Sequence, residues 1–128
     1  MSKTVDHTVF VIDDDEAVRD SLQLLLESHG LTACAYATAR AFLNANPKPV
    51  SGCLLLDIHM PGMSGLELLD ELRARGAAIP VIGITGRYDA GLGRRLKEAG
   101  VMDLLLKPVD DVELKAAIDQ ALNSLRAG

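Results

Sequence analysis

Cys53-Leu-Leu-Leu-Asp57-Ile-His-Met-Pro-Gly62 is the stretch around which the rest of the chain can be interpreted. Four apolar residues run directly into one carboxylate, and Pro61 and Gly62 then prevent a regular element from continuing. A short apolar run bounded by turn residues is typical of a buried strand. Asp57 would stand at the carboxyl end of that strand, and ligands bind at this edge in open α/β sheets. We therefore expect Asp57 to be the chemical centre of the protein.

The remaining chain alternates short apolar runs with segments of helical spacing. The predicted strands besides the one ending at Asp57 cover residues 9–12, 31–37, 79–84 and 101–106. Helix-length connections between them imply parallel pairing and right-handed crossovers. Five strand-helix units of this kind predict a doubly wound α/β fold of three layers. The apolar and polar alternation in 31–37 places that strand at a sheet edge.

Several residues mark where the predicted helices begin. Ser64 and Glu67 match the S-x-x-E capping box. Asp15 suits the N-cap of the first helix, and Asp110 or Asp111 suits that of the last.

The segment from Tyr88 to Ala99 is expected to be the least stable helix. Leu92 within it has helical spacing to later apolar residues, but Gly91 and Gly93 each cost about 1 kcal/mol relative to Ala.

Composition limits the function classes. The 128 residues fit one domain, expected to span 1–128 with a core of about 8–126, and 48% of them are apolar. The net charge of −5 argues against a basic nucleic-acid face.

No apolar run approaches the ~18 residues of a membrane span, and residues 1–6 lack the apolar core of a signal peptide, so we expect a cytoplasmic protein without membrane contact. Cys34 and Cys53 lack metal-site spacing and are expected to be buried thiols.

Reactive groups follow four of the five predicted strands. These groups are Asp13 and Asp14, Asp57, Thr85 and Lys107. The carboxyl ends of parallel strands share one edge, so three carboxylates would meet there and repel one another unless a cation intervened. Hard oxygen ligands in a small site favour Mg²⁺ over Ca²⁺. Such a site is suited to phosphoryl transfer with a carboxylate nucleophile, which forms an acyl phosphate.

Four motifs stand together at these strand ends: Val11-Ile-Asp-Asp-Asp-Glu16, Leu55-Leu-Asp-Ile-His-Met-Pro-Gly-Met-Ser-Gly65, Pro80-Val-Ile-Gly-Ile-Thr-Gly86 and Lys107-Pro108. With them the chain resembles a response-regulator receiver domain of two-component signalling, and most of all the FixJ type that precedes a helix-turn-helix output domain. Thr85 and Lys107 follow Asp57 by 28 and 50 residues, which agrees with that family. The resemblance covers about residues 8 to 126. It implies a flavodoxin-like (βα)5 fold with strand order 2-1-3-4-5.

The resemblance implies a role for each matching acidic position. Asp57 would accept a phosphoryl group from a histidine kinase. Asp14 would bind Mg²⁺ directly, Asp13 mostly through water, and His59 through its backbone carbonyl.

The resemblance also implies how the phosphoryl group is bound and how its presence changes the conformation of the domain. Thr85 and the Gly86 amide would bond phosphoryl oxygens, Lys107 would pair with the group, and the Lys107-Pro108 bond would be cis. The fourth helix, fifth strand and fifth helix would then switch to control an output domain or partner, which leaves room for a phosphorylation-dependent homodimer. DNA would be reached only through a separate output domain, and the domain would catalyse only its own phosphorylation and dephosphorylation.

Four positions bear on switching and phosphoryl lifetime. Leu104 stands where the family usually has Tyr or Phe, so the usual outward coupling is expected to be weaker or to use other groups. Tyr88 is a candidate substitute, although an exposed ring is the preferred interpretation. Arg87 either reaches the anion or lies on the surface. For His59, a solvent-facing ring is preferred to one that covers the phosphoryl group.

Two alternatives stand beside the signalling hypothesis. A small phosphatase or phosphotransferase with an aspartyl intermediate is one, but haloacid-dehalogenase-type enzymes carry a second Asp where this chain has His59. The chain also leaves no room for their substrate cap. A pseudo-receiver scaffold is the other, and the intact set of Asp14, Asp57, Thr85 and Lys107 argues against it.

Overall fold

The computed structural model describes residues 8–47 and 51–127 and contains ten regular elements in that part of the chain. The strands are β1 (Thr8–Ile12), β2 (Thr32–Tyr36), β3 (Gly52–Asp57), β4 (Val81–Thr85) and β5 (Asp103–Leu106). The helices are α1 (Glu16–Ser28), α2 (Ala39–Ala45), α3 (Gly65–Ala74), α4 (Ala90–Glu98) and α5 (Asp111–Ala127). Strand and helix alternate throughout, as the sequence predicts.

The strands form one parallel sheet in the order β2-β1-β3-β4-β5. The predicted doubly wound α/β class and strand order are confirmed, and β2 lies at an edge as its alternation indicated. β3 lies at the centre, between β1 and β4, and Asp57 pairs in register with Ile84. The short β5 forms the other edge.

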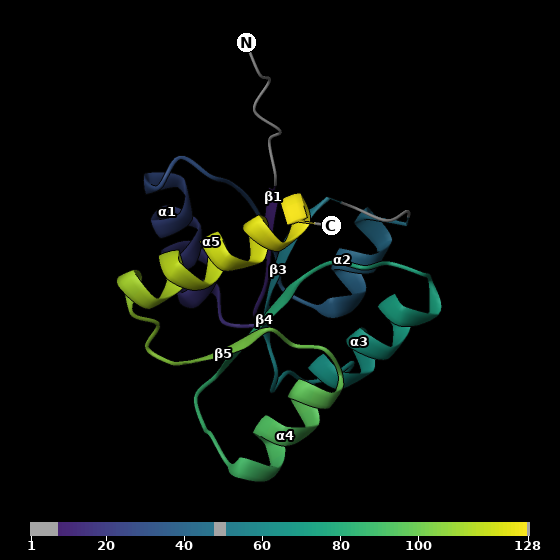
Figure 1. Ribbon diagram of the computed structural model, residues 1–128. Coiled ribbons are helices and arrows are strands. Elements are labelled where there is room, and N and C mark those ends of the chain that lie inside the picture. The colour runs from purple at the N-terminus through teal and green to yellow at the C-terminus, as the bar shows by residue number, and fades with distance from the viewer. Residues whose placement is uncertain (1–7, 48–50, 128) are drawn as a thin grey trace.

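Helices cover both faces of the sheet (Figure 1). On one face α2, α3 and α4 pack against the side chains of Leu54 and Leu56 of β3. On the other face α1 and α5 pack against Cys53 and Leu55. Every residue of β3 is therefore buried, which explains why its sequence is continuously apolar.

Most predicted helix starts are confirmed by side-chain caps. The Asp15 carboxylate accepts from the amides of Ala17 and Val18 at 2.9 and 3.3 Å. Ser64 and Glu67 form the reciprocal capping box. Of the two candidates for the last helix, Asp110 is the cap, since its carboxylate accepts from the Glu113 amide at 3.0 Å.

Helix α4 begins later than predicted. It starts at Ala90 because the Asp89 carboxylate accepts from the Leu92 amide at 2.7 Å and caps the helix. Tyr88 consequently lies in the loop between β4 and α4 rather than in the helix. The sequence signal for this boundary is Asp89, an N-cap residue type three positions before Leu92.

Two smaller expectations concern the thiols and the membrane. Cys53 is buried as expected, and burial raises the pKa of its thiol to about 12, whereas Cys34 is only half-buried. Among the described residues, none of the helices combines the length and apolar character needed to cross a membrane. The first seven residues, on which part of the localisation prediction rests, lie outside the described range.

Candidate functional site

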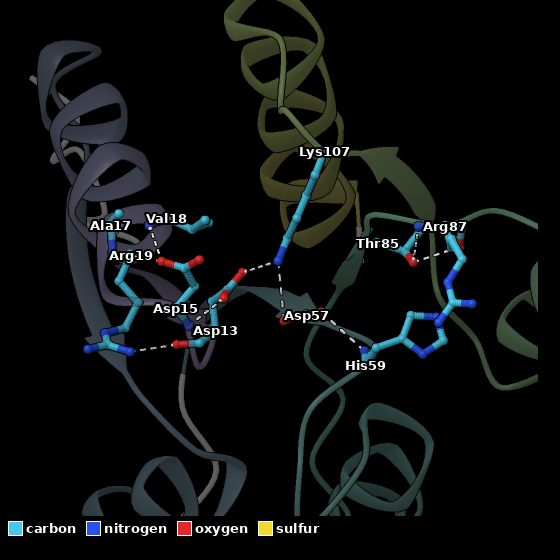
Figure 2. Close-up of polar contacts among 10 residues, drawn as sticks. All are labelled: Asp13, Asp15, Ala17, Val18, Arg19, Asp57, His59, Thr85, Arg87 and Lys107. Atoms are coloured by element: carbon cyan, nitrogen blue, oxygen red, sulfur yellow. Dashed lines mark hydrogen bonds and ion pairs between the residues drawn. The ribbon is translucent and has the colours of Figure 1, made fainter.

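Four neighbouring strands bring the predicted site residues to one edge of the sheet. Asp57 is the last residue of β3 and Thr85 the last of β4. Asp13 follows β1 directly, and Lys107 follows β5 directly. Figure 2 shows the Lys107 side chain reaching across this edge to a point between Asp13 and Asp57.

Lys107 is the cation that these two carboxylates share. Its Nζ lies 2.9 Å from Asp13 Oδ2 and 3.3 Å from Asp57 Oδ2. Burial lowers the pKa of Lys107, but its contact with Asp13 and the charges of Asp13 and Asp57 outweigh burial and raise the pKa above the ordinary 10.5. The lysine therefore carries its charge throughout the neutral range.

Asp57 is almost fully buried, with 3% of its surface exposed. Burial and the negative charge of Asp13 raise the pKa of Asp57 from 3.8 to about 6. Lys107 limits this rise, as does the His59 amide, which donates to Asp57 Oδ1 at 3.1 Å. One carboxylate oxygen thus faces an ammonium and the other a backbone N–H.

A small divalent cation fits this set of oxygens. Carboxylate oxygens of Asp13, Asp14 and Asp57 lie within 4.8 Å of one another. Asp13 Oδ2 is fully buried; among the described residues it forms an ion pair with Lys107 at 2.9 Å but no hydrogen bond of suitable alignment. Three carboxylates against one ammonium leave excess negative charge, and hard oxygen ligands suit Mg²⁺.

Asp13 is fixed in place by its backbone and side-chain partners. Its amide donates to the Tyr36 carbonyl at 3.2 Å, and its Oδ1 accepts from the Asp15 amide at 2.9 Å. Its carbonyl accepts from Arg19 Nη1 at 2.8 Å (Figure 2). Sequence reasoning missed Arg19, because an arginine on an amphipathic helix resembles any other solvated side chain.

Thr85 is placed at the site, but its hydroxyl is engaged elsewhere. The hydroxyl donates to the Arg87 carbonyl at 2.8 Å and accepts from the Arg87 amide at 3.1 Å. The residue is fully buried. Gly86, whose amide was predicted to help hold the phosphoryl group, is exposed, and a Cβ there would meet nothing within 4 Å.

The side chains of His59, Arg87 and Tyr88 are all exposed. This exposure agrees with the preferred interpretation of both rings as solvent-facing, and the role of His59 toward a phosphoryl group stays a prediction. Tyr88 is 60% exposed, yet its ring lies against Gly93 of α4. Leu104 is half-buried and packs against Gly83, its partner on β4, and against the core formed with α2, α3 and α4.

Comparisons with known proteins agree with this geometry. The family model for the response regulator receiver domain matches residues 9–119. The transcriptional regulatory protein FixJ of Azorhizobium caulinodans is 49% identical over 114 residues, which cover 89% of this chain and 54% of that protein. The response regulator protein TodT of Pseudomonas putida is 39% identical over 114 residues, covering 89% of this chain and 50% of that protein.

A solved structure supports the same assignment. The crystal structure of FixJ-N matches with a TM-score of 0.86 at 38% identity and covers 94% of this chain and 96% of that one. This chain spans about half the length of the two curated relatives, which extend beyond the receiver domain. The fold, the strand-end acidic cluster and these matches together show that the chain belongs to the response-regulator receiver domains, of the FixJ type.

Proposed function

We propose that Asp57 accepts a phosphoryl group from the phosphohistidine of a histidine kinase while Mg²⁺ is bound beside it. The observation that carries this proposal is the shared position of Lys107 between two buried carboxylates, next to an oxygen cluster that fits the metal. We further propose that residues 8–126 act as one receiver unit. The domain would catalyse only its own phosphorylation and dephosphorylation.

In the transfer step an Asp57 carboxylate oxygen forms a bond to phosphorus as the nitrogen–phosphorus bond of the phosphohistidine breaks. The bonding electron pair stays with the ring of the kinase histidine, which leaves as a neutral imidazole because its other nitrogen carries a proton, and no oxidant or reductant is needed. When bound, Mg²⁺ supplies positive charge that offsets the charge of the phosphoryl oxygens. Lys107 offers a second positive charge within reach of the same carboxylate.

The exposure and contacts of three residues support the metal roles that we propose for them. Asp14 is exposed and offers its carboxylate directly to the metal. Asp13 is already tied to Lys107, so a contact through water suits it better. The backbone carbonyl of His59 is the third proposed protein ligand. Its amide is already bound to Asp57, which keeps this backbone segment next to the nucleophile.

Capture of the phosphoryl group would reorganise the loop after β4. Thr85 can donate only one hydrogen bond, and it now donates to the Arg87 carbonyl. To donate to a phosphoryl oxygen, its hydroxyl must leave that carbonyl, which frees the loop that carries Tyr88. Gly86 offers its amide in the same segment. The proposed signal is a shift in the population of this loop and of the α4, β5 and α5 surface.

That surface is the proposed contact for the next partner. In a longer regulator it would face an output domain, through which alone DNA would be reached, and a phosphorylation-dependent homodimer is the alternative. Leu104 lacks the ring that usually mediates the coupling. Arg87, whose backbone bonds to the Thr85 hydroxyl, and Tyr88, whose ring lies against Gly93 of α4, are the proposed substitutes.

The test is phosphorylation of the chain by acetyl phosphate with Mg²⁺, followed by intact mass. Wild type is expected to gain one phosphoryl group and Asp57→Asn none. Sizing of the protein with beryllofluoride and Mg²⁺ then reports whether the modified form dimerises. No adduct on wild type, or an adduct that persists in Asp57→Asn, contradicts the proposal. Steady turnover of a generic phosphate ester would instead favour the phosphatase alternative.

A further inference from the structure

We infer that Arg19 is a positioning residue for the metal site at Asp13 and Asp14. This inference rests on the proposed function, since it concerns the same Mg²⁺ site. Arg19 lies on α1, is half-buried, and donates from Nη1 to the Asp13 carbonyl at 2.8 Å. Figure 2 shows its guanidinium reaching back past the first turn of the helix to the turn that follows β1.

The bond acts on the peptide group that joins the two proposed ligands. A peptide group is planar, so the direction of the Asp13 carbonyl also fixes the direction of the Asp14 amide and the position of the Asp14 Cα. Among the described residues, the Asp14 carboxylate has neither a hydrogen-bond nor an ion-pair partner. The backbone therefore sets where this side chain begins, and Arg19 holds that backbone.

The other polar groups of Asp13 are already fixed. The amide is held by Tyr36, Oδ1 by the Asp15 amide and Oδ2 by Lys107. The carbonyl is the remaining group, and it faces the guanidinium. Loss of Arg19 would leave the Asp13 side chain anchored but would let the following peptide rotate, which separates the Asp14 oxygens from those of Asp13 and Asp57.

Because Arg19 is positively charged, the direction in which Mg²⁺ affinity changes on its removal tests this inference. A positive charge near a cation site opposes cation binding, so removal of the charge alone should tighten Mg²⁺ binding. Removal of a positioning contact should weaken it, because groups that orient metal ligands typically contribute about tenfold or more to affinity. The two effects have opposite directions, and the positioning effect is expected to dominate.

The experiment measures Mg²⁺ affinity of the 128-residue chain by titration calorimetry. Arg19→Met keeps the aliphatic packing and removes both donor and charge, and we expect its Kd to rise about tenfold. Arg19→Lys keeps the charge but offers a less directed donor, and we expect a rise of about threefold. Arg40→Met is the matched control, since Arg40 is exposed on α2 and its loss removes the same charge. We expect the control to keep the wild-type Kd.

A second readout separates positioning from general stabilisation. In Arg19→Met, the Mg²⁺ concentration that gives half-maximal acetyl-phosphate labelling of Asp57 should rise with the Kd, while the rate at saturating Mg²⁺ stays near wild type. An unchanged or tighter Kd in Arg19→Met, even with a lowered melting temperature, overturns the inference and leaves the proposed function intact. If Arg19→Met does not fold, a wild-type Kd in Arg19→Lys overturns it. Failure of wild type to bind Mg²⁺ or to be labelled would instead remove the proposed function.

Discussion

At the scale of single residues, Asp57 bears a charge that its surroundings oppose. Burial and Asp13 raise its pKa to about 6, and Lys107 and the His59 amide offset only part of that effect. In the unfolded chain the same carboxyl has its ordinary pKa of 3.8. The folded protein therefore binds this proton more tightly than the unfolded chain, and ionisation of the Asp57 carboxyl lowers the free energy of unfolding at neutral pH.

Asp57→Asn should accordingly be more stable than wild type in metal-free buffer. Wild type loses stability as the pH rises from about 4 to about 6, because the unfolded chain gives up the proton first, and the loss is complete above pH 6. The variant lacks this loss. Their difference should grow from near zero at pH 4 to about 2 to 3 kcal/mol at pH 7, since the shift is about two units at about 1.4 kcal/mol each.

Urea unfolding at several pH values with a chelator present measures this difference. Asp70→Asn is the control, because Asp70 is exposed on α3 and its replacement removes the same charge from the surface. A difference between Asp57→Asn and wild type that stays constant from pH 4 to 7 would contradict the raised pKa.

At the scale of elements, the β4 and β5 pair depends on the absence of a side chain at Gly83. A Cβ there would lie 3.0 Å from Leu104 Cδ1 and 3.2 Å from Ile58 Cδ1. Leu104 occupies the space above its register partner, and this packing holds it toward the core.

Gly83→Ala is expected to destabilise the protein by about 1 to 3 kcal/mol through overpacking. In a Leu104→Ala background the loss should be smaller, because the main clash is gone. A double-mutant cycle in urea gives the coupling between the two positions. If Gly83→Ala costs the same stability in both backgrounds, Leu104 does not contribute to the overpacking. Gly86→Ala serves as the control, since no atom lies within 4 Å of its added Cβ.

The contact between Tyr88 and α4 supports a second prediction at this scale. Gly93→Ala should gain about 1 kcal/mol from helix propensity. The added Cβ would lie 3.0 Å from Cε1 and Oη of Tyr88, so the gain should appear fully only in a Tyr88→Ala background. Thermal melting of the four proteins measures this. A full gain in the wild-type background would mean that the ring moves aside freely.

Much of the element order was predictable from the sequence, because the spacing of apolar residues and the capping residues depend on local backbone structure. The start of α4 was not, because Tyr88 has the same apparent helical spacing as Leu92, and only the Asp89 cap separates them. Helix α3 shows a second limit, because Leu68 is fully buried while Leu66, two residues earlier on the same helix, is half-exposed. Spacing alone does not show which side of a stripe faces the sheet.

At the scale of the whole molecule, the parallel sheet is what assembles the site. The sequence predicted the group at the strand ends because topology forces those ends together. It did not predict that Lys107 would bridge Asp13 and Asp57, that the Thr85 hydroxyl would bond to Arg87, or that Arg19 would hold Asp13. Those contacts depend on distances of a few ångströms between side chains far apart in the chain.

If Mg²⁺ binds the cluster of Asp13, Asp14 and Asp57 as proposed, the stability of the whole domain should depend on Mg²⁺. A ligand that binds only the folded state adds about 1.4 kcal/mol for each tenfold rise in its concentration above the Kd. Wild type should show this rise in urea unfolding, and Asp14→Asn should lose most of it. Sodium chloride at matched ionic strength is the control for screening. An equal rise in wild type and Asp14→Asn would place the metal elsewhere.

The two halves of the site rest on strands with different surroundings. Asp57 ends a central strand that is buried on both faces, whereas Lys107 follows a four-residue edge strand on which Leu106 is 52% exposed. Edge strands fray in the native state more readily than central ones. Brief fraying of β5 would withdraw the ammonium while the carboxylate stayed in place. Amide hydrogen exchange should therefore be fast along β5 and slow along β3. The fraction of time for which Lys107 neutralises Asp57 would then be set by how often β5 opens.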